Sequence, residues 1–127
     1  MPVARSSDHR VFEVTESTGN VTVTGLASPS RGATEILMYR IDLAPGAALP
    51  PHRHDHEEVF HLLSGTLTSV QAGERIAVRA GDAVMIPPSV PHHAQAGPDG
   101  AVLLVAMRKG TRTIRPDGAS IVPPWGQ

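Results

Sequence analysis

The sequence contains no cysteine, so disulfide bonds and thiolate metal ligands are both excluded. Aromatic residues make up only 3% of the chain, too few for the stacking platforms that bind unpaired bases. Lysine and arginine are scattered along a chain of formal net charge -1, and no basic stripe is available to neutralise phosphates. No nucleic acid partner is therefore expected.

Long hydrophobic runs are also absent. The first fourteen residues, MPVARSSDHRVFEV, hold no apolar stretch of the length that a signal peptide or a membrane span requires. We therefore expect no membrane partner and a cytoplasmic location.

Glycine and proline are abundant, with twelve of each in 127 residues. They fall between short segments rich in valine, isoleucine, leucine and threonine, a pattern typical of an all-β protein with many turns. A chain of this length fits one domain over residues 1–127, and no internal repeat divides it. The expected strands are Val11–Thr15, Asn20–Gly25, Thr34–Leu43, Val59–Leu63, Thr66–Gln71, Arg75–Arg79, Ala83–Ile86, His92–Gln95 and Ala101–Met107.

No segment shows a helical apolar stripe with a cap at both ends. The region after Arg108 is polar and then rich in proline. We expect it to form an extended arm with little internal structure, packed either on the barrel or on a partner subunit.

Histidines are the most informative feature, because six of the seven lie between positions 52 and 93. Neutral imidazole is the commonest metal-ligating side chain. Alternate residues of a strand share a face, so His52 and His54 point the same way, and Glu58 has the same parity. Glu58 joins them if the chain bends without a bulge, and His92 would then reach the site from a later strand across the barrel. Three imidazoles and one carboxylate leave one or two positions of a divalent ion open, as working metal sites do.

These residues resemble the two signature motifs of the cupin superfamily. The first motif is Gly46, five residues, His52, one residue, His54, three residues, Glu58, six residues, Gly65, and every gap fits the family pattern. The second motif begins with Gly81, five residues and Pro87, and it places its histidine at His92. Ser89 stands where the family usually has glycine, and Ala96 stands where it often has asparagine.

The resemblance covers about residues 34–107 and implies a single jelly-roll β-barrel of two facing antiparallel sheets. It implies that His52, His54, Glu58 and His92 hold one divalent transition metal per chain, which could be Fe, Mn, Ni, Cu or Zn. The chain is similar to small metallo-cupins of the quercetin dioxygenase-like group. Similar single-barrel cupins often form homodimers through their terminal strands, which residues 11–25 and the Trp125 tail would suit.

Other residues are candidates for the pocket. Met38, Phe60 and Met85 are expected to line it, and an inward-facing Arg40 would bind a substrate carboxylate; a surface position for Arg40 is the competing interpretation. His56, His61 and His93 lie beside the motifs but off the ligand positions. We expect them to point away from the metal.

Function follows from the metal. The first expectation is a dioxygenase-like oxidoreductase that acts on a small organic molecule with a redox-active ion. A redox-silent ion would instead predict an isomerase, cyclase or lyase. Glu58 would be the catalytic residue, either as a ligand only or also as a carrier of a proton. A barrel that binds a small ligand without catalysis is the third hypothesis.

Overall fold

The computed structural model describes residues 1–127 and is built almost entirely from strands. The strands in chain order are β1 (Val11–Glu13), β2 (Val21–Ala27), β3 (Ile36–Leu43), β4 (Ala48–His54), β5 (Glu58–Gln71), β6 (Glu74–Arg79), β7 (Ala83–Ile86), β8 (His92–Arg108), β9 (Thr113–Ile114) and β10 (Ser120–Ile121). Three single-turn 3-10 helices complete the chain: η1 (Ser6–Asp8), η2 (Pro29–Arg31) and η3 (Pro124–Gly126). None of these helices has the length and hydrophobicity needed to cross a membrane.

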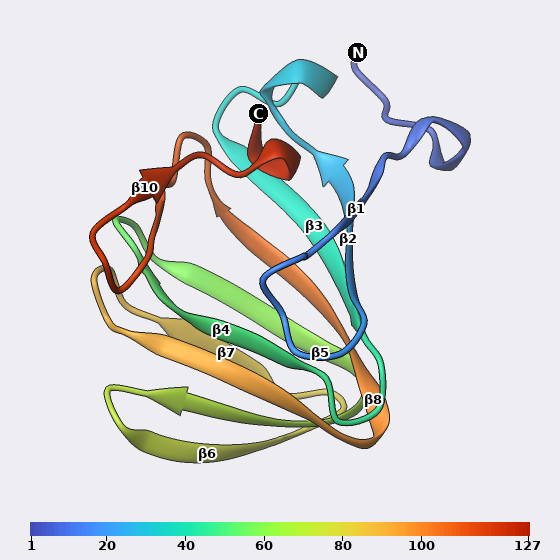
Figure 1. Cartoon of the computed structure of the whole chain (residues 1–127). Coiled ribbons are helices and arrows are strands. Elements are labelled where there is room, and N and C mark those ends of the chain that lie inside the picture. Colours follow the sequence, from blue (N-terminus) through green and yellow to red (C-terminus); the bar gives the residue numbers. More distant parts are fainter.

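The strands form one curled antiparallel sheet that closes into a barrel (Figure 1). The sheet runs in the order β1-β2-β3-β8-β4-β9-β10, and β5 pairs with β6, β7 and β8. Strand β8 connects the two halves, because its beginning pairs with β4 and its end, from Ala101 to Arg108, pairs with β3. The expected all-β jelly-roll barrel is confirmed.

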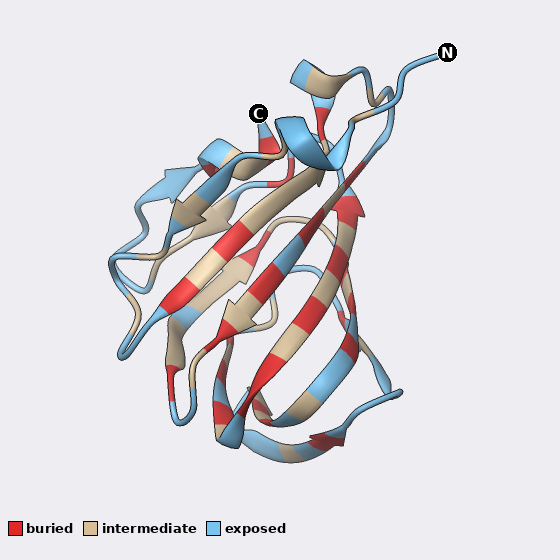
Figure 2. Cartoon of the chain, turned by 90° about the vertical axis from the view of Figure 1, so that its right-hand side faces the viewer, coloured by how far each residue is buried: buried red, intermediate tan, exposed pale blue.

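The core follows the two-residue period of a strand. In β3, Leu37, Tyr39, Ile41 and Leu43 are buried and the residues between them are half-buried or exposed. The same banding runs along the other long strands (Figure 2). Full burial of one large aliphatic or aromatic side chain stabilises a fold by roughly 1.5–3 kcal/mol, so this inward face holds the barrel together.

Two pairs of expected strands are continuous. Segments 59–63 and 66–71 join in β5, and segments 92–95 and 101–107 join in β8. Gly65 marks a bend inside β5 where the register shifts. A Cβ atom there would lie 2.0 Å from the carbonyl oxygen of Gly100, so the two strands cross at a distance that only glycine allows.

Strand β4 was not among the expected strands, and Pro50 and Pro51 lie within it. Proline cannot donate to a sheet ladder, so it is tolerated only at edges and irregularities. The pairing of β4 with β8 is irregular at this point, with a register shift between Leu49 and His52.

The C-terminal arm, residues 109–127, packs on its own barrel. Its strand β9 pairs with β4, and β10 pairs with β9. The Trp125 ring lies 6.1 Å from the ring of Phe12 and 6.0 Å from that of Tyr39, centroid to centroid. The arm therefore covers one end of the barrel and ties the two chain ends together.

Candidate metal centre

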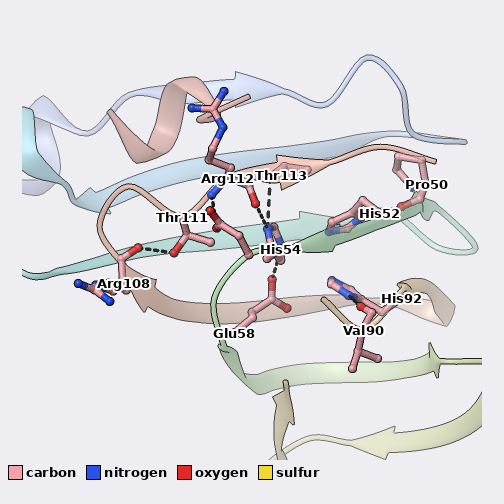
Figure 3. A network of polar contacts seen from close by, with 11 residues as sticks. Pro50, His52, His54, Glu58, Val90, His92, Arg108, Thr111, Arg112 and Thr113 are labelled. Carbon is pink, nitrogen blue, oxygen red and sulfur yellow. Dashed lines mark hydrogen bonds and ion pairs between the residues drawn. The ribbon is translucent and has the colours of Figure 1, made fainter. Parts of the chain in front are cut away.

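The four expected ligands lie together inside the barrel (Figure 3). His52 and His54 are on β4, Glu58 begins β5 and His92 begins β8. One ligand atom from each residue lies within 4.8 Å of all the others. Ligands at about 2.0–2.2 Å from a common ion lie at most about 4.4 Å apart, so a slight closure of this cluster accommodates one ion.

The strands that bring the ligands together are not arranged as strand parity predicted. Residues 55–57 form a bend between β4 and β5, so Glu58 arrives from a second strand and parity does not carry across. His92 is the direct register partner of His52 on the adjacent strand, and it does not reach across the barrel as expected. The first motif thus encodes a strand, a corner and the start of the next strand.

All three imidazoles are held in the same tautomer by backbone carbonyls. His52 donates from Nδ1 to the Pro50 carbonyl at 2.8 Å, and His92 donates from Nδ1 to the Val90 carbonyl at 2.9 Å. His54 makes the corresponding contact with the Arg112 carbonyl at 3.3 Å. A bond at Nδ1 leaves the lone pair of Nε2 free to bind a metal.

The Nε2 atoms of His54 and His92 are buried and have no hydrogen-bond partner. His54 Nε2 lies 3.1 Å from Glu58 Oε1, close but without the geometry of a hydrogen bond. A buried polar atom without a partner costs about 1–3 kcal/mol. A cation between the imidazoles and the carboxylate would satisfy all of these atoms at once, so the residues fit a divalent metal.

Burial sets the protonation state in favour of metal binding. Burial, together with the neighbouring His92 and His54 rings, lowers the pKa of His52 to about 4. Burial also lowers the pKa of His92. For Glu58 burial acts in the opposite direction, but the surrounding imidazoles of His54, His92 and His52 prevail and its pKa is lowered. At neutral pH His52 and His92 are therefore neutral and Glu58 is ionised, the forms that bind metals.

The ligands face a cavity of about 280 Å³. Its interior wall is mainly apolar, and Val23, Ile41, Phe60, Leu103 and Val105 contribute to it. Val14, Pro123 and Trp125 line it from the N-terminal segment and the C-terminal arm. Open metal positions would therefore face a mainly apolar pocket suited to a small organic molecule.

Only one of the four expected substrate residues lines the cavity. Phe60 is buried and lines the cavity as predicted. Arg40, Met38 and Met85 do not line it. The inward orientation was therefore wrong for all three, and for Arg40 the competing surface position is confirmed. Arg40 pairs with Asp42 on the outer face and its side chain is 47% exposed. Met38 shares that outer face, and Met85 is exposed on β7.

The physical reason is the same for all three residues. In β3 the larger apolar set, with Tyr39 at its centre, takes the inside, which leaves Met38 and Arg40 outside. In β7 Ile86 is buried, so its neighbour Met85 points outward.

The histidines off the motif are peripheral to the ligand set. His61 is exposed, and His56 bonds to Asp55 at 3.0 Å in the corner between β4 and β5. His93 is half-buried and borders the cavity. None of the three belongs to the metal-ligating cluster.

Tyr39 and Ser69 are among the cavity residues that the sequence reasoning missed. Tyr39 is buried and lines the cavity beside the ligands. Burial, reinforced by the negative charge of Glu58, raises its pKa well above the usual value, so the phenol keeps its proton. Ser69 is 1% exposed and also lines the cavity. Inward parity on β3 was the available signal for Tyr39, and assigning the inside to Arg40 concealed it.

Comparison with known proteins agrees with the cupin motifs of the sequence. A family profile described as cupin domain matches residues 39–108. The pectin degradation protein KdgF of Dickeya dadantii is 30% identical over 71 residues, which cover 55% of this chain and 64% of that protein. The chain thus spans less than two thirds of this relative.

Solved structures with the same fold include two similar proteins. The polyketide cyclase RemF of Streptomyces resistomycificus superposes with a TM-score of 0.72 and is 25% identical. The match covers 90% of this chain and 85% of RemF. A cupin-like protein of Thermotoga maritima has a TM-score of 0.66 with 28% identity, covering 84% of this chain and 77% of that one.

Proposed function

Because this chain belongs to the cupin domain family, we propose that it is a metal-dependent enzyme acting on a small organic molecule in the barrel. The observation that carries the proposal is the pair of buried, unpartnered Nε2 atoms of His54 and His92. They face the Glu58 carboxylate beside a largely apolar cavity. A purely structural polar cluster would satisfy these atoms within the chain.

His52, His54, Glu58 and His92 would hold one divalent ion, which when bound polarises substrate oxygen atoms as a Lewis acid. Tyr39, protonated and buried beside Glu58, can donate a hydrogen bond to an oxygen atom of the substrate. Glu58 is the one buried carboxylate of the cavity, so it is the carboxylate that can take a proton there. The apolar wall excludes water from the bound substrate.

We place a redox-neutral reaction first, as an isomerisation, cyclisation or lyase step. The support is the similarity to RemF, a polyketide cyclase, together with a protonated phenol next to the ligands. The dioxygenase-like reaction of the quercetin dioxygenase-like group is the second candidate. It is favoured by the ligand set, since three imidazoles and a carboxylate also suit iron, manganese, nickel and copper.

The first experiment is metal analysis of protein purified without a nickel column, with oxygen uptake recorded as catechol-like and enediol compounds are added. Near-stoichiometric metal without oxygen uptake supports the redox-neutral class, and uptake supports the dioxygenase. His52→Ala and His92→Ala should each lose most of the metal while circular dichroism shows the barrel intact. Full metal content in both variants would contradict the proposal.

The homodimer expected from the sequence stays a prediction. Size-exclusion chromatography with light scattering tests it directly, and a molar mass near 13.4 kDa would contradict it.

A further inference from the structure

The outer part of the cavity is built by the two ends of the chain. The N-terminal segment lines it with four consecutive residues, 13–16, and the C-terminal arm lines it as well. Both lie outside residues 39–108, which the cupin profile matches. The lining residues of the arm are Thr113, Arg115, Ile121, Pro123, Pro124 and Trp125. The cavity is therefore covered by parts of the chain that do not belong to the shared barrel.

The arm is held on the barrel by few buried groups. Three of its nineteen residues are buried, Thr111, Pro123 and Gly126, and none of them has a large aliphatic or aromatic side chain. Its strands β9 and β10 have two residues each. An ion pair between Arg115 and Glu16, which we call the latch, joins the arm to the N-terminal segment, and both side chains are partly exposed. A segment with so little buried apolar surface opens at a lower free energy than the barrel core.

The same arm reaches the metal centre through His54 (Figure 3). The carbonyl oxygen of Arg112 lies 3.3 Å from His54 Nδ1, and the hydroxyl oxygen of Thr113 lies 3.4 Å from the same atom. The Nδ1 bonds of His52 and His92 to nearby backbone carbonyls are shorter, at 2.8 and 2.9 Å. The chain itself therefore fixes the tautomer of His54 less firmly than that of the other two imidazoles.

A metal ion would fix the tautomer of His54. Neutral imidazole carries its proton on one ring nitrogen, and an ion on Nε2 requires the proton on Nδ1, where it is donated to the Arg112 carbonyl. Without an ion the proton can reside on Nε2, which lies 3.1 Å from Glu58 Oε1. The Thr113 hydroxyl can then turn to donate to Nδ1, but the Arg112 carbonyl faces a lone pair and loses its bond. Metal binding therefore strengthens a contact that holds the arm.

We infer that closure of the C-terminal arm over the cavity is coupled to metal occupancy, with Glu16 and Arg115 as the positioning residues that keep the arm closed. The inference rests on the proposed metal-dependent function. Coupling of this kind is reciprocal, so the ion holds the arm closed and the closed arm holds the ion. Arg115 lies two residues beyond Thr113, so the latch limits the movement of the segment that contacts His54. An open arm gives the ion access to its ligands, and loading covers them.

Trypsin tests the effect of the ion on the arm. Arg112 lies within the arm, whereas Arg75 and Arg79 are exposed on β6 and provide an internal control. Cleavage is followed by mass spectrometry in metal-free protein and in protein loaded with Zn²⁺. Zinc should slow cleavage after Arg112 at least roughly fivefold more than cleavage after Arg75 and Arg79. Equal protection at the three sites would mean that zinc stabilises the whole barrel, and this result would overturn the inference.

The fluorescence of Trp125 provides a second readout, since Trp125 is the only tryptophan of the chain and lies on the arm. Zn²⁺ is redox-inactive, so it does not quench the indole by electron transfer. Zinc should lower the quenching of Trp125 by acrylamide about twofold or more, because the ring is then kept against Phe12 and Tyr39. Unchanged quenching with zinc bound stoichiometrically would also overturn the inference.

Glu16→Gln breaks the latch and tests the effect of the arm on the ion. Glu13→Gln is the matched control, because Glu13 lines the cavity from the same segment but forms no ion pair. Glu16→Gln should weaken Zn²⁺ binding about two- to fivefold in competition with a chelator and speed cleavage after Arg112 by a similar factor. Glu13→Gln should leave both values unchanged.

Exchange of the two charges of the latch, Glu16→Arg with Arg115→Glu, restores the ion pair and should recover the original Zn²⁺ affinity. Equal losses in Glu16→Gln and Glu13→Gln would show that only the charge near the site matters, and the role of the latch would then be overturned.

The zinc content of the same samples separates the two failures. Protein that takes up no zinc contradicts the proposed function. Protein that binds zinc stoichiometrically while its arm gains no protection overturns the coupling alone.

Discussion

The Nδ1 atom of His54 lies 3.3 Å from the carbonyl oxygen of Arg112, a residue 58 positions further along the chain. The other two imidazoles find their carbonyl partners two residues away, at Pro50 and Val90. His54 alone depends on the C-terminal arm for its orientation. Asp55 holds that part of the arm in place, since its carboxylate accepts the Arg112 backbone N–H at 2.8 Å.

Asp55→Ala should therefore weaken metal binding although Asp55 is not a ligand. Loss of its contact frees the Arg112 peptide and with it the partner of His54 Nδ1. Changes to the groups that orient metal ligands typically cost 10- to 100-fold in affinity. Zn²⁺ titration against a competing chelator measures the effect. Asp42→Asn, which breaks an ion pair on the outer face, is the control and should leave the affinity unchanged.

Ser89→Gly should stabilise the protein. Ser89 has a φ of 66°, and its N–H donates to the His54 carbonyl at 2.7 Å. It follows Pro88 in a turn closed by the Val90 N–H and the Pro87 carbonyl, and a positive φ at this position favours glycine. We expect a gain of about 0.5–1 kcal/mol, seen as a higher Tm. Ser89→Ala keeps the strained Cβ and should give no gain; equal gains in the two variants would contradict the argument.

Much of the barrel could be predicted from sequence because its cause is local. Short β-branched segments, turn residues and the absence of a helical stripe were sufficient for an all-β fold, and the motif spacing identified the ligand cluster. Ser89 shows the limit, since the sequence marks the departure from glycine but not the positive φ that the chain keeps there.

The predictions that failed were those that depended on which face of a strand turns inward. Parity correctly grouped Met38 with Arg40, but it could not say that Tyr39 and Ile41 take the inside. That choice is made by packing against other strands, which a single segment does not encode. The same holds for Trp125, whose place against Phe12 and Tyr39 depends on two distant parts of the chain.

Gly65→Ala should abolish the fold or destabilise it by more than about 3 kcal/mol. Its φ is 78°, and the new Cβ would lie 2.0 Å from the Gly100 carbonyl oxygen, so β5 and β8 would have to separate. Gly73→Ala isolates the backbone contribution, because φ there is 83° but no atom lies within 4 Å of the new Cβ. It should cost only about 1–2 kcal/mol. Urea unfolding measures both, and similar losses in the two variants would contradict the steric explanation.

The pH dependence of the metal-free protein follows from the buried imidazoles. The pKa of His52 is about 4 in the folded chain, and an unfolded histidine has about 6.5. Between these values the unfolded state binds the proton and the folded state does not, so stability falls as pH is lowered from about 6.5 towards 4. The lowered pKa of Glu58 acts in the same direction, since its contribution is lost as pH falls through its folded pKa.

The His52 contribution amounts to at most about 3.5 kcal/mol, because one pKa unit corresponds to about 1.4 kcal/mol. Urea unfolding of metal-free protein at pH 7, 5.5 and 4.5 should show the decline. His52→Gln should reduce its slope, since glutamine does not take up the proton. His61→Gln, at an exposed position of β5, should leave the slope as it is in the original chain. The stability of the His52→Gln variant, the His61→Gln variant and the original protein could also decline equally as pH falls. That outcome would show that burial of His52 is not what makes the metal-free barrel sensitive to acid.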